Sequence, residues 1–241
     1  MLPIDSIIML MTLSISCIDT LNYNQTLKAL KSTLATTPAT RVYWLADCPC
    51  PETLTVPVEW IRIKRFDPKT MIYNHWYSYA CLRVMPAVVD TDHNIIIHAD
   101  GYAVNGAAWT DQFLEYDYIG APWLWWPDGE NVGNGGFTLR SRRLYDALID
   151  WEPSYRTQDW PDLDARYYYQ DRSGHTTFCE DNLLAGPYRK VLEPEYGIKY
   201  APIDLAHRFS IEGSESYSSP WFKQSLGFHG KETALHYGVT L

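Results

Sequence analysis

The sequence predicts an α/β fold with a mostly parallel central sheet. Short, nearly continuous apolar segments are typical of strands that a parallel sheet buries on both faces, and several occur in the first hundred residues. Segments with helical spacing lie between them, which gives the strand–helix alternation of α/β proteins. With 241 residues, 46% hydrophobic and 20% charged, and no internal repeat or low-complexity linker, we expect one domain with a substantial core.

Residues 6–16 form the first expected strand. This apolar segment also resembles the core of a signal peptide, but no basic residue flanks it and Asp5 lies directly before it. It is much shorter than the ~20 apolar residues of a membrane span. The five cysteines are odd in number and irregularly spaced, which favours a reducing compartment. We therefore expect a cytoplasmic protein without a transmembrane span.

The remaining elements of the first half follow in order. A helix of about 16 residues is expected from Asn22, because the apolar residues at 23, 27, 30 and 34 share one helical face. Short strands are expected at 41–46, 59–64 and 94–98. A second helix is expected over 73–84, with Pro86 limiting it. Cys48-Pro49-Cys50 fits a turn better than a metal or redox motif, since no second cysteine pair accompanies it.

The second half is less regular. Residues 118–136 are rich in glycine, proline and tryptophan and show no clear period. A helix is expected over 142–151 and a short helix near Glu180, separated by a long polar and aromatic loop. From residue 209 onward we expect mainly turns.

The composition restricts the partners. The formal net charge of −9 argues against nucleic acid or an anionic membrane as the main partner. Aromatic residues make up 15% of the chain, which excludes a disordered protein and suits either a large core or a cleft for hydroxyl-rich ligands. Trp44, Trp60 and Trp76 are expected in the core. Other rings gather around the irregular segments, where they suit sugar stacking or local packing: Trp123, Trp125, Trp126, Trp151, Trp160 and Tyr167–Tyr169.

Four groups of residues could carry chemistry. Asp100 ends a strand, where a carboxylate can bind a divalent cation or cap a turn. Glu180-Asp181 opens a helix, where acids either complement the helix dipole or act as a general base. The glycines at 133, 135 and 136 allow close backbone approach, although a hairpin turn would also explain them. His229 lies between two glycines in the tail, either as an ordinary histidine or folded onto a site.

The order of these pieces resembles the DUF5672 family, which is related to GT-A glycosyltransferases. The resemblance covers roughly residues 10–232 and is carried by DYIGAPW at 117–123, VGNGGFTLRS at 132–141, Glu180-Asp181 and GFHG at 227–230. It implies a Rossmann-like nucleotide-binding half (1–105) and an irregular acceptor and catalytic half (106–241) of a single GT-A-like domain. It also implies a nucleotide-sugar donor, a carbohydrate or other hydroxyl acceptor, and Mn²⁺ or Mg²⁺.

The resemblance also assigns roles. Asp100 and His229 would bind the metal, with His98 in place of the first Asp of the usual Asp-X-Asp motif. Asp181 would be the catalytic base and Glu180 a partner of the acceptor hydroxyl, although the reverse is open. Residues for the nucleotide or donor would be Ser16, Cys17 and Asp19 after the first strand, with Tyr73, Asn74, His98 and Gly101. Residues for the acceptor would be Trp123, Asn134, Gly135 and Gly136.

Two alternatives remain open, one for Asn74 and one for the function of the whole chain. Asn74 could cap its helix instead of reaching a nucleotide. The whole chain could be a non-catalytic carbohydrate-binding protein on the same fold, or a glycoside hydrolase that uses paired carboxylates.

Overall fold

A six-stranded sheet forms the centre of the computed structural model, which describes residues 11–124, 126, 132–153, 169–170 and 176–241. The strand order is β3-β2-β1-β4-β7-β6. β7 runs in the opposite direction to the other five strands, so the predicted, mostly parallel sheet is confirmed. The strands are β1 (Leu13–Ile18), β2 (Arg41–Ala46), β3 (Val58–Arg62), β4 (His93–Ile97), β6 (Tyr118–Ile119) and β7 (Phe137–Ser141).

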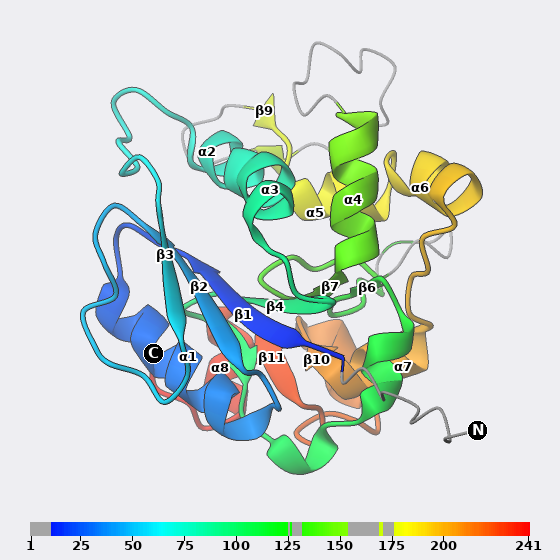
Figure 1. Cartoon of the computed structure of the whole chain (residues 1–241). Coiled ribbons are helices and arrows are strands. Elements are labelled where there is room, and N and C mark those ends of the chain that lie inside the picture. The colour runs from blue at the N-terminus through cyan, green and yellow to red at the C-terminus, as the bar shows by residue number, and fades with distance from the viewer. Residues whose placement is uncertain (1–10, 125, 127–131, 154–168, 171–175) are drawn as a thin grey trace, which may run out of the picture.

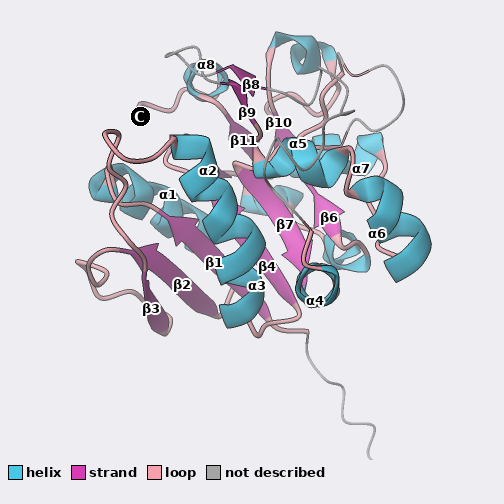
Figure 2. Cartoon of the chain, turned by 90° about the horizontal axis from the view of Figure 1, so that it is seen from above, coloured by secondary structure: helices cyan, strands magenta, loops and turns pink. Residues whose placement is uncertain are grey.

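Helices cover both faces of this sheet. α1 (Tyr23–Thr36) lies on one face, and the consecutive helical segments α2 (Tyr73–Tyr79) and α3 (Met85–Val88) lie on the other with α4 (Arg142–Trp151) (Figures 1 and 2). The buried side chains of α1 are Thr26, Leu27, Ala29, Leu30 and Thr33, close to the stripe that its sequence spacing predicts.

A second sheet of three short strands lies on the α1 side of the main sheet (Figure 1). Its order is β10-β11-β5, with bounds β5 (Gly101–Ala103), β10 (Ser210–Ile211) and β11 (Gly227–His229). β11 pairs antiparallel with β5, so that His229 lies opposite Gly101. This pairing brings the C-terminal part of the chain against the end of β4.

The remaining described elements are short. They are β8 (Tyr169–Gln170), β9 (Thr176–Thr177), α5 (Glu180–Ala185), α6 (Arg189–Tyr196), α7 (Ile203–Phe209) and α8 (Lys231–His236), with 3₁₀ turns at Gly106–Ala108, Asp111–Glu115 and Ser214–Ser218.

Several sequence expectations about these elements were wrong. The described part of the first strand is shifted toward the C-terminus, to Leu13–Ile18. The helix expected to stop before Pro86 continues to Val88, because a π-helical turn over Ala80–Val84 leads into α3 with Pro86 in its first turn. The strands from β5 to β11 lie in segments for which no strand was expected, and α8 lies in the tail where mainly turns were expected.

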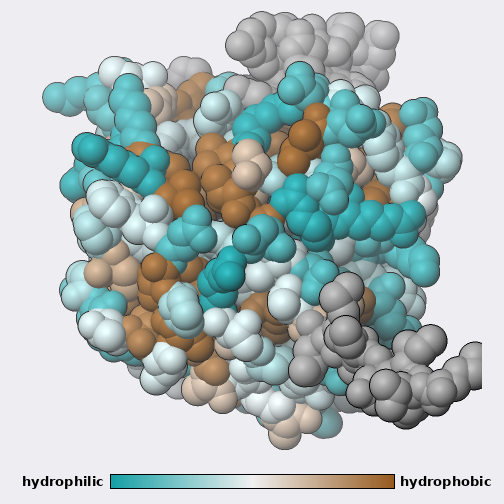
Figure 3. Space-filling model, viewed as in Figure 1, coloured by the Kyte–Doolittle hydropathy of each residue, from teal (hydrophilic) through white to brown (hydrophobic). Residues whose placement is uncertain are grey.

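The core follows the predicted strands, with one exception among the tryptophans. Trp44 is fully buried in β2 and Trp76 is partly buried, whereas Trp60 on the edge strand β3 is 40% exposed. On the face shown in Figure 3, hydrophobic residues lie in separate patches between hydrophilic ones. This face therefore has no continuous apolar surface that would suggest a functional site.

No helix among the described residues is long and apolar enough to cross a membrane. The five cysteines are all free thiols, and Cys48 and Cys50 follow β2 in a loop, as expected.

Candidate active site

The candidate site lies where the strand order of the main sheet reverses. The chain builds β1, β2 and β3 outward and then returns to place β4 on the other side of β1. Ligands of open α/β sheets bind outside the carboxyl ends of the strands at such a point. A cavity of about 370 Å³ lies there, and its lining residues include Asp19, Gln25, Thr26, Tyr73, His98, Asp100 and Lys231.

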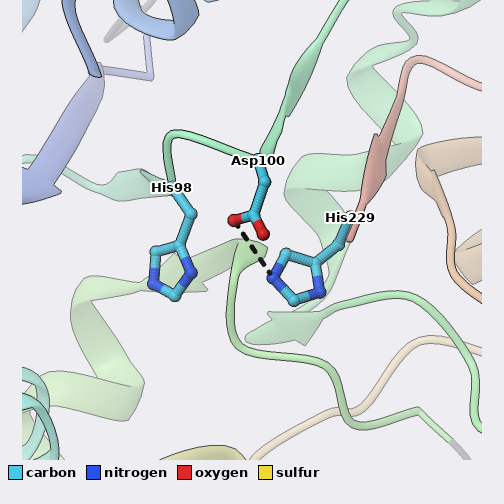
Figure 4. Close-up of side chains that lie close together, drawn as sticks. All are labelled: His98, Asp100 and His229. Atoms are coloured by element: carbon cyan, nitrogen blue, oxygen red, sulfur yellow. Dashed lines mark ion pairs between the residues drawn. The ribbon is translucent and has the colours of Figure 1, made fainter. Parts of the chain in front are cut away.

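Two histidines and an aspartate meet beside this cavity (Figure 4). His98 and Asp100 come from the turn between β4 and β5, and His229 ends β11. One potential ligand atom from each lies within 4.8 Å of the others, and His229 Nε2 is 3.9 Å from Asp100 Oδ1. His98 Nε2 contacts the Tyr77 hydroxyl, while its other ring nitrogen faces Asp100 and His229. The structure thus places Asp100 and His229, the two residues that the resemblance assigned to the metal, close together, and adds His98, which was expected at the donor.

Two glycines make room for His229. A Cβ atom on Gly136 would lie 2.1 Å from His229 Nε2, and one on Gly101 would lie 2.6 Å from His229 Cδ2. Both distances are far below van der Waals contact, so any side chain at either position would displace the imidazole. Gly101 and Gly136 therefore leave the space that the His229 ring occupies.

The three side chains differ in charge. Burial and the neighbouring His229 lower the pKa of His98 to about 4, so this ring is neutral at pH 7. Burial by itself would lower the pKa of His229, but the carboxylates of Glu212, Asp100 and Asp181 outweigh it and raise this pKa to about 9. One carboxylate oxygen and two imidazole nitrogens form a donor set that suits Mn²⁺ better than Mg²⁺, which prefers oxygen ligands.

The acidic pair at the start of α5 divides into two environments. Glu180 is buried against Arg140 of β7, with Oε1 3.0 Å from Nη2, and the two side chains are 4% and 0% exposed. Asp181 accepts hydrogen bonds from the N–H groups of Gly135 (2.9 Å) and Asn182 (2.8 Å). Burial and the adjacent Glu180 carboxylate raise the pKa of Asp181 to about 7. Asp181 can therefore exchange a proton near neutral pH.

The glycine-rich loop before β7 packs against the other site residues. A Cβ on Gly135 would lie 2.2 Å from Glu180 Oε1, and one on Gly133 would lie 2.3 Å from the Trp123 ring. The Asn134 side chain accepts hydrogen bonds from Gly136 N (2.9 Å) and Phe137 N (3.3 Å), which folds the loop back on itself. The glycines thus allow the acidic pair, Trp123 and His229 to approach one backbone segment.

The residues expected at the nucleotide are not all in the cavity. Tyr73 and Asp19 line it, and Tyr73 is 42% exposed. Asp19 accepts hydrogen bonds from Leu21 N (2.6 Å) and Asn22 N (2.9 Å) and so supports the start of α1. The expectation that Ser16 and Cys17 follow the first strand was wrong, because both are buried inside β1.

Asn74 neither lines the described cavity nor caps its helix. The cap position of α2 is Ile72, and Asn74 Nδ2 donates to Cys179 Sγ at 3.3 Å, beside the acidic pair.

Of the two interpretations of the Trp123 ring, sugar stacking and local packing, the structure shows local packing. This side chain is 5% exposed, stacks on Trp126 with ring centroids 4.8 Å apart, and donates from Nε1 to Glu212 Oε2 at 2.9 Å. Trp151 packs against Tyr188. Trp125, Trp160, Tyr167 and Tyr168, for which sugar stacking or local packing was expected, lie outside the described residues.

Two residues of the site were missed from the sequence. Lys231 lines the cavity and supplies positive charge among its acidic neighbours. Its position directly after His229-Gly230 was the available signal. Glu212 contacts His229 Nδ1 through Oε1 at 2.7 Å. Nothing in the sequence around residue 212 indicates this contact.

Comparison with known proteins agrees with this geometry. The family model described as Protein of unknown function (DUF5672) matches residues 61–229, more than half of the chain. The chain belongs to the DUF5672 family. The match includes Asp100, the glycine-rich loop and the acidic pair, and it ends at His229. No curated protein matches this DUF5672 member in sequence.

Solved structures show the fold. The galactosyltransferase LgtC, in complex with donor and acceptor sugar analogs, is similar with a TM-score of 0.53 and 14% identity over 91% of this chain and 87% of that chain. An active-site mutant of LgtC gives a TM-score of 0.51 at 15% identity, with the same coverage. GlyE of Streptococcus pneumoniae gives 0.49 at 13% identity over 90% of this chain and 54% of that chain. This DUF5672 protein has the GT-A-like glycosyltransferase fold that the resemblance implied.

Proposed function

We propose that this protein is a metal-assisted glycosyltransferase, which moves a sugar from a nucleotide-sugar to a hydroxyl acceptor. The observation that carries the proposal is the cluster of His98, Asp100 and His229 on the rim of the cavity at the sheet's switch point. A glycosyltransferase fold and a site that combines a metal-binding set, a cavity and a nearby titratable carboxylate together support this reaction class.

The donor nucleotide would occupy the cavity. Tyr73 offers an exposed ring on its wall for stacking on a base, and Lys231 offers a cation for the diphosphate. The acidic residues Asp19 and Asp100 also line the cavity. A diphosphate would therefore need Lys231, and a cation held by Asp100, to offset these charges.

Asp100, His229 and His98 would hold Mn²⁺. When bound, the ion would neutralise negative charge that develops on the leaving diphosphate. His98 is neutral at pH 7 and can donate its lone pair, whereas His229 must release a proton before Nε2 can do so.

Asp181 would accept the proton of the acceptor hydroxyl. Its pKa of about 7 leaves a large ionised fraction at neutral pH and still makes it a stronger base than an ordinary carboxylate. The N–H groups of Gly135 and Asn182 hold its two oxygens in place. Glu180 is almost fully buried with Oε1 paired to Arg140, so an acceptor hydroxyl has little access to its carboxylate. We therefore propose Glu180 as an anchor of α5 and not as the acceptor's partner.

Thermal unfolding in the presence of nucleotides tests this function. A nucleoside diphosphate with Mn²⁺ at 100 times its Kd adds about 2.7 kcal/mol of stability, or roughly 5–11 °C in Tm for a chain of this size. Asp100→Ala should remove the Mn²⁺-dependent part of the shift, whereas Asp204→Ala, an exposed aspartate in α7, should retain it. The absence of a shift with UDP, GDP and the other diphosphates would refute the proposal.

Two alternatives give different outcomes. A glycoside hydrolase would release sugar without any nucleotide-sugar, but the burial of Glu180 against Arg140 leaves the acidic pair with one available carboxylate instead of two. A non-catalytic binding protein would show the thermal shift and no sugar transfer, with or without an acceptor.

A further inference from the structure

The imidazole of His229 is contacted at Nδ1 by two groups that require opposite protonation. Glu212 Oε1 lies 2.7 Å away and can only accept a hydrogen bond from Nδ1–H. The Asn134 amide nitrogen lies 2.9 Å away and can only donate to a bare Nδ1. The Asn134 amide cannot rotate without loss, because its oxygen already accepts from the backbone of Gly136 and Phe137.

Only one of these arrangements allows His229 to bind a cation. The neutral ring carries one proton, and the nitrogen without it is the potential ligand. Nε2 faces Asp100, so a cation at this site needs the proton on Nδ1, as Glu212 favours. A proton on Nε2, as Asn134 favours, would point N–H into the site.

The surroundings of Glu212 call for a carboxylate. Its second oxygen, Oε2, accepts a hydrogen bond from Trp123 Nε1 at 2.9 Å, so two N–H donors face the two oxygens. Glutamine would present its NH₂ group to one of them. Glu212 directly follows β10, which pairs in parallel with β11, so the backbone register holds residue 212 beside His229.

We infer that Glu212 is a positioning residue, which keeps the proton of His229 on Nδ1 and leaves Nε2 free for a divalent cation. The inference rests on the proposed metal site. Carboxylates behind a metal-bound histidine fix its tautomer and orientation, and their loss commonly weakens metal affinity about 10–100-fold. Trp123 in turn holds the Glu212 carboxylate through its Nε1–H, so this buried ring would support the metal site indirectly.

A titration with Mn²⁺ alone, followed by the EPR signal of free Mn²⁺, tests the inference without any turnover. Glu212→Gln should weaken Mn²⁺ affinity about 10–100-fold. Glu215→Gln is the matched control, because it removes the same charge from an exposed residue in the following 3₁₀ turn, and it should leave the affinity within about twofold of wild type.

The swap variant Glu212→Gln with Asn134→Asp separates positioning from folding. An aspartate at 134 can accept hydrogen bonds both from the loop N–H groups and from His229 Nδ1–H. It therefore offers Nδ1–H a carboxylate from residue 134 in place of the one lost at residue 212. We expect it to recover most of the affinity that Glu212→Gln loses, which a merely structural role of Glu212 would not allow. Thermal unfolding without metal shows whether each variant is folded. If Glu212→Gln does not fold, the Mn²⁺ affinity of the swap variant is compared with that of Asn134→Asp alone.

The outcomes are distinct. Equal Mn²⁺ affinity in wild type and Glu212→Gln, or no recovery in the swap, overturns this inference alone. No Mn²⁺ binding by the wild-type protein overturns the proposed metal site and the inference together.

Discussion

Replacing Asp181 by asparagine should stabilise the protein at alkaline pH. Burial and Glu180 raise the pKa of Asp181 from 3.8 to about 7. An acid whose pKa is higher in the folded than in the unfolded state contributes stability that is fully present below pH 3.8 and is lost as the pH rises through 7. Above pH 7 the folded protein holds a charge that the unfolded chain would carry at lower free energy. Asp181→Asn removes that charge.

The magnitude follows from the shift. About three pH units at 1.36 kcal/mol each give a ceiling of about 4 kcal/mol at pH 8. Asparagine has one acceptor oxygen where the carboxylate serves two N–H groups, which costs about 1 kcal/mol. Partial exposure of Asp181 lowers the gain further. We expect Asp181→Asn to be more stable than wild type by about 1–3 kcal/mol at pH 8, and less stable by about 1 kcal/mol at pH 3.5.

Urea unfolding of both proteins at the two pH values measures this difference. Asp204→Asn, the same chemical change at an exposed position, is the control and should change stability by no more than about 0.5 kcal/mol at either pH. If the stability difference between Asp181→Asn and wild type is the same at pH 3.5 and pH 8, Asp181 does not titrate near neutrality and the reasoning about the base fails.

Three further predictions concern the same site. The pH profile of kcat/KM should rise with an apparent pKa of about 7, as Asp181 loses its proton, and a flat profile from pH 5 to 8 would contradict this. Gly136→Ala should lower Mn²⁺ affinity at least about tenfold by displacing His229, whereas Gly106→Ala, far less crowded, should not; unchanged affinity in Gly136→Ala would show that the ring is not a ligand. Arg140→Met should cost about 3–5 kcal/mol in urea unfolding by leaving Glu180 unpartnered, and adding Glu180→Gln should restore most of it; additive losses would argue against the ion pair.

The sequence predicted the parallel part of the sheet well and its antiparallel part badly. β1, β2 and β4 are apolar over most of their length, so their burial is visible in the residues themselves. β7 is equally buried but contains Arg140, whose charge is compensated by Glu180 forty positions later. Such a pairing depends on the tertiary structure and leaves no local pattern. β11 has three residues and owes its existence to neighbouring strands on both sides.

The candidate site was predictable to the extent that its residues end strands or stand in recognisable motifs. Asp100 follows β4, and His229 and Asp181 lie in segments that resemble a family. Ser16 and Cys17 were misplaced because the first strand extends to Ile18 and not to Ser16. Glu212 could not be found, because its role arises from the register between β10 and β11, which no sequence spacing records.

The position of His229 on β11 has a consequence for how the protein matures. His98 and Asp100 emerge early during synthesis, but the second imidazole, that of His229, arrives only when β11 has entered the space between β10 and β5. A cation bound by all three residues would link the end of β4 to β11, which is far away in sequence. It would therefore stabilise the fully folded protein relative to states in which β11 is not yet paired. Affinity for Mn²⁺ would then report whether the C-terminal segment is seated, and a chain that stops before residue 227 would be recognisable by its inability to retain the ion.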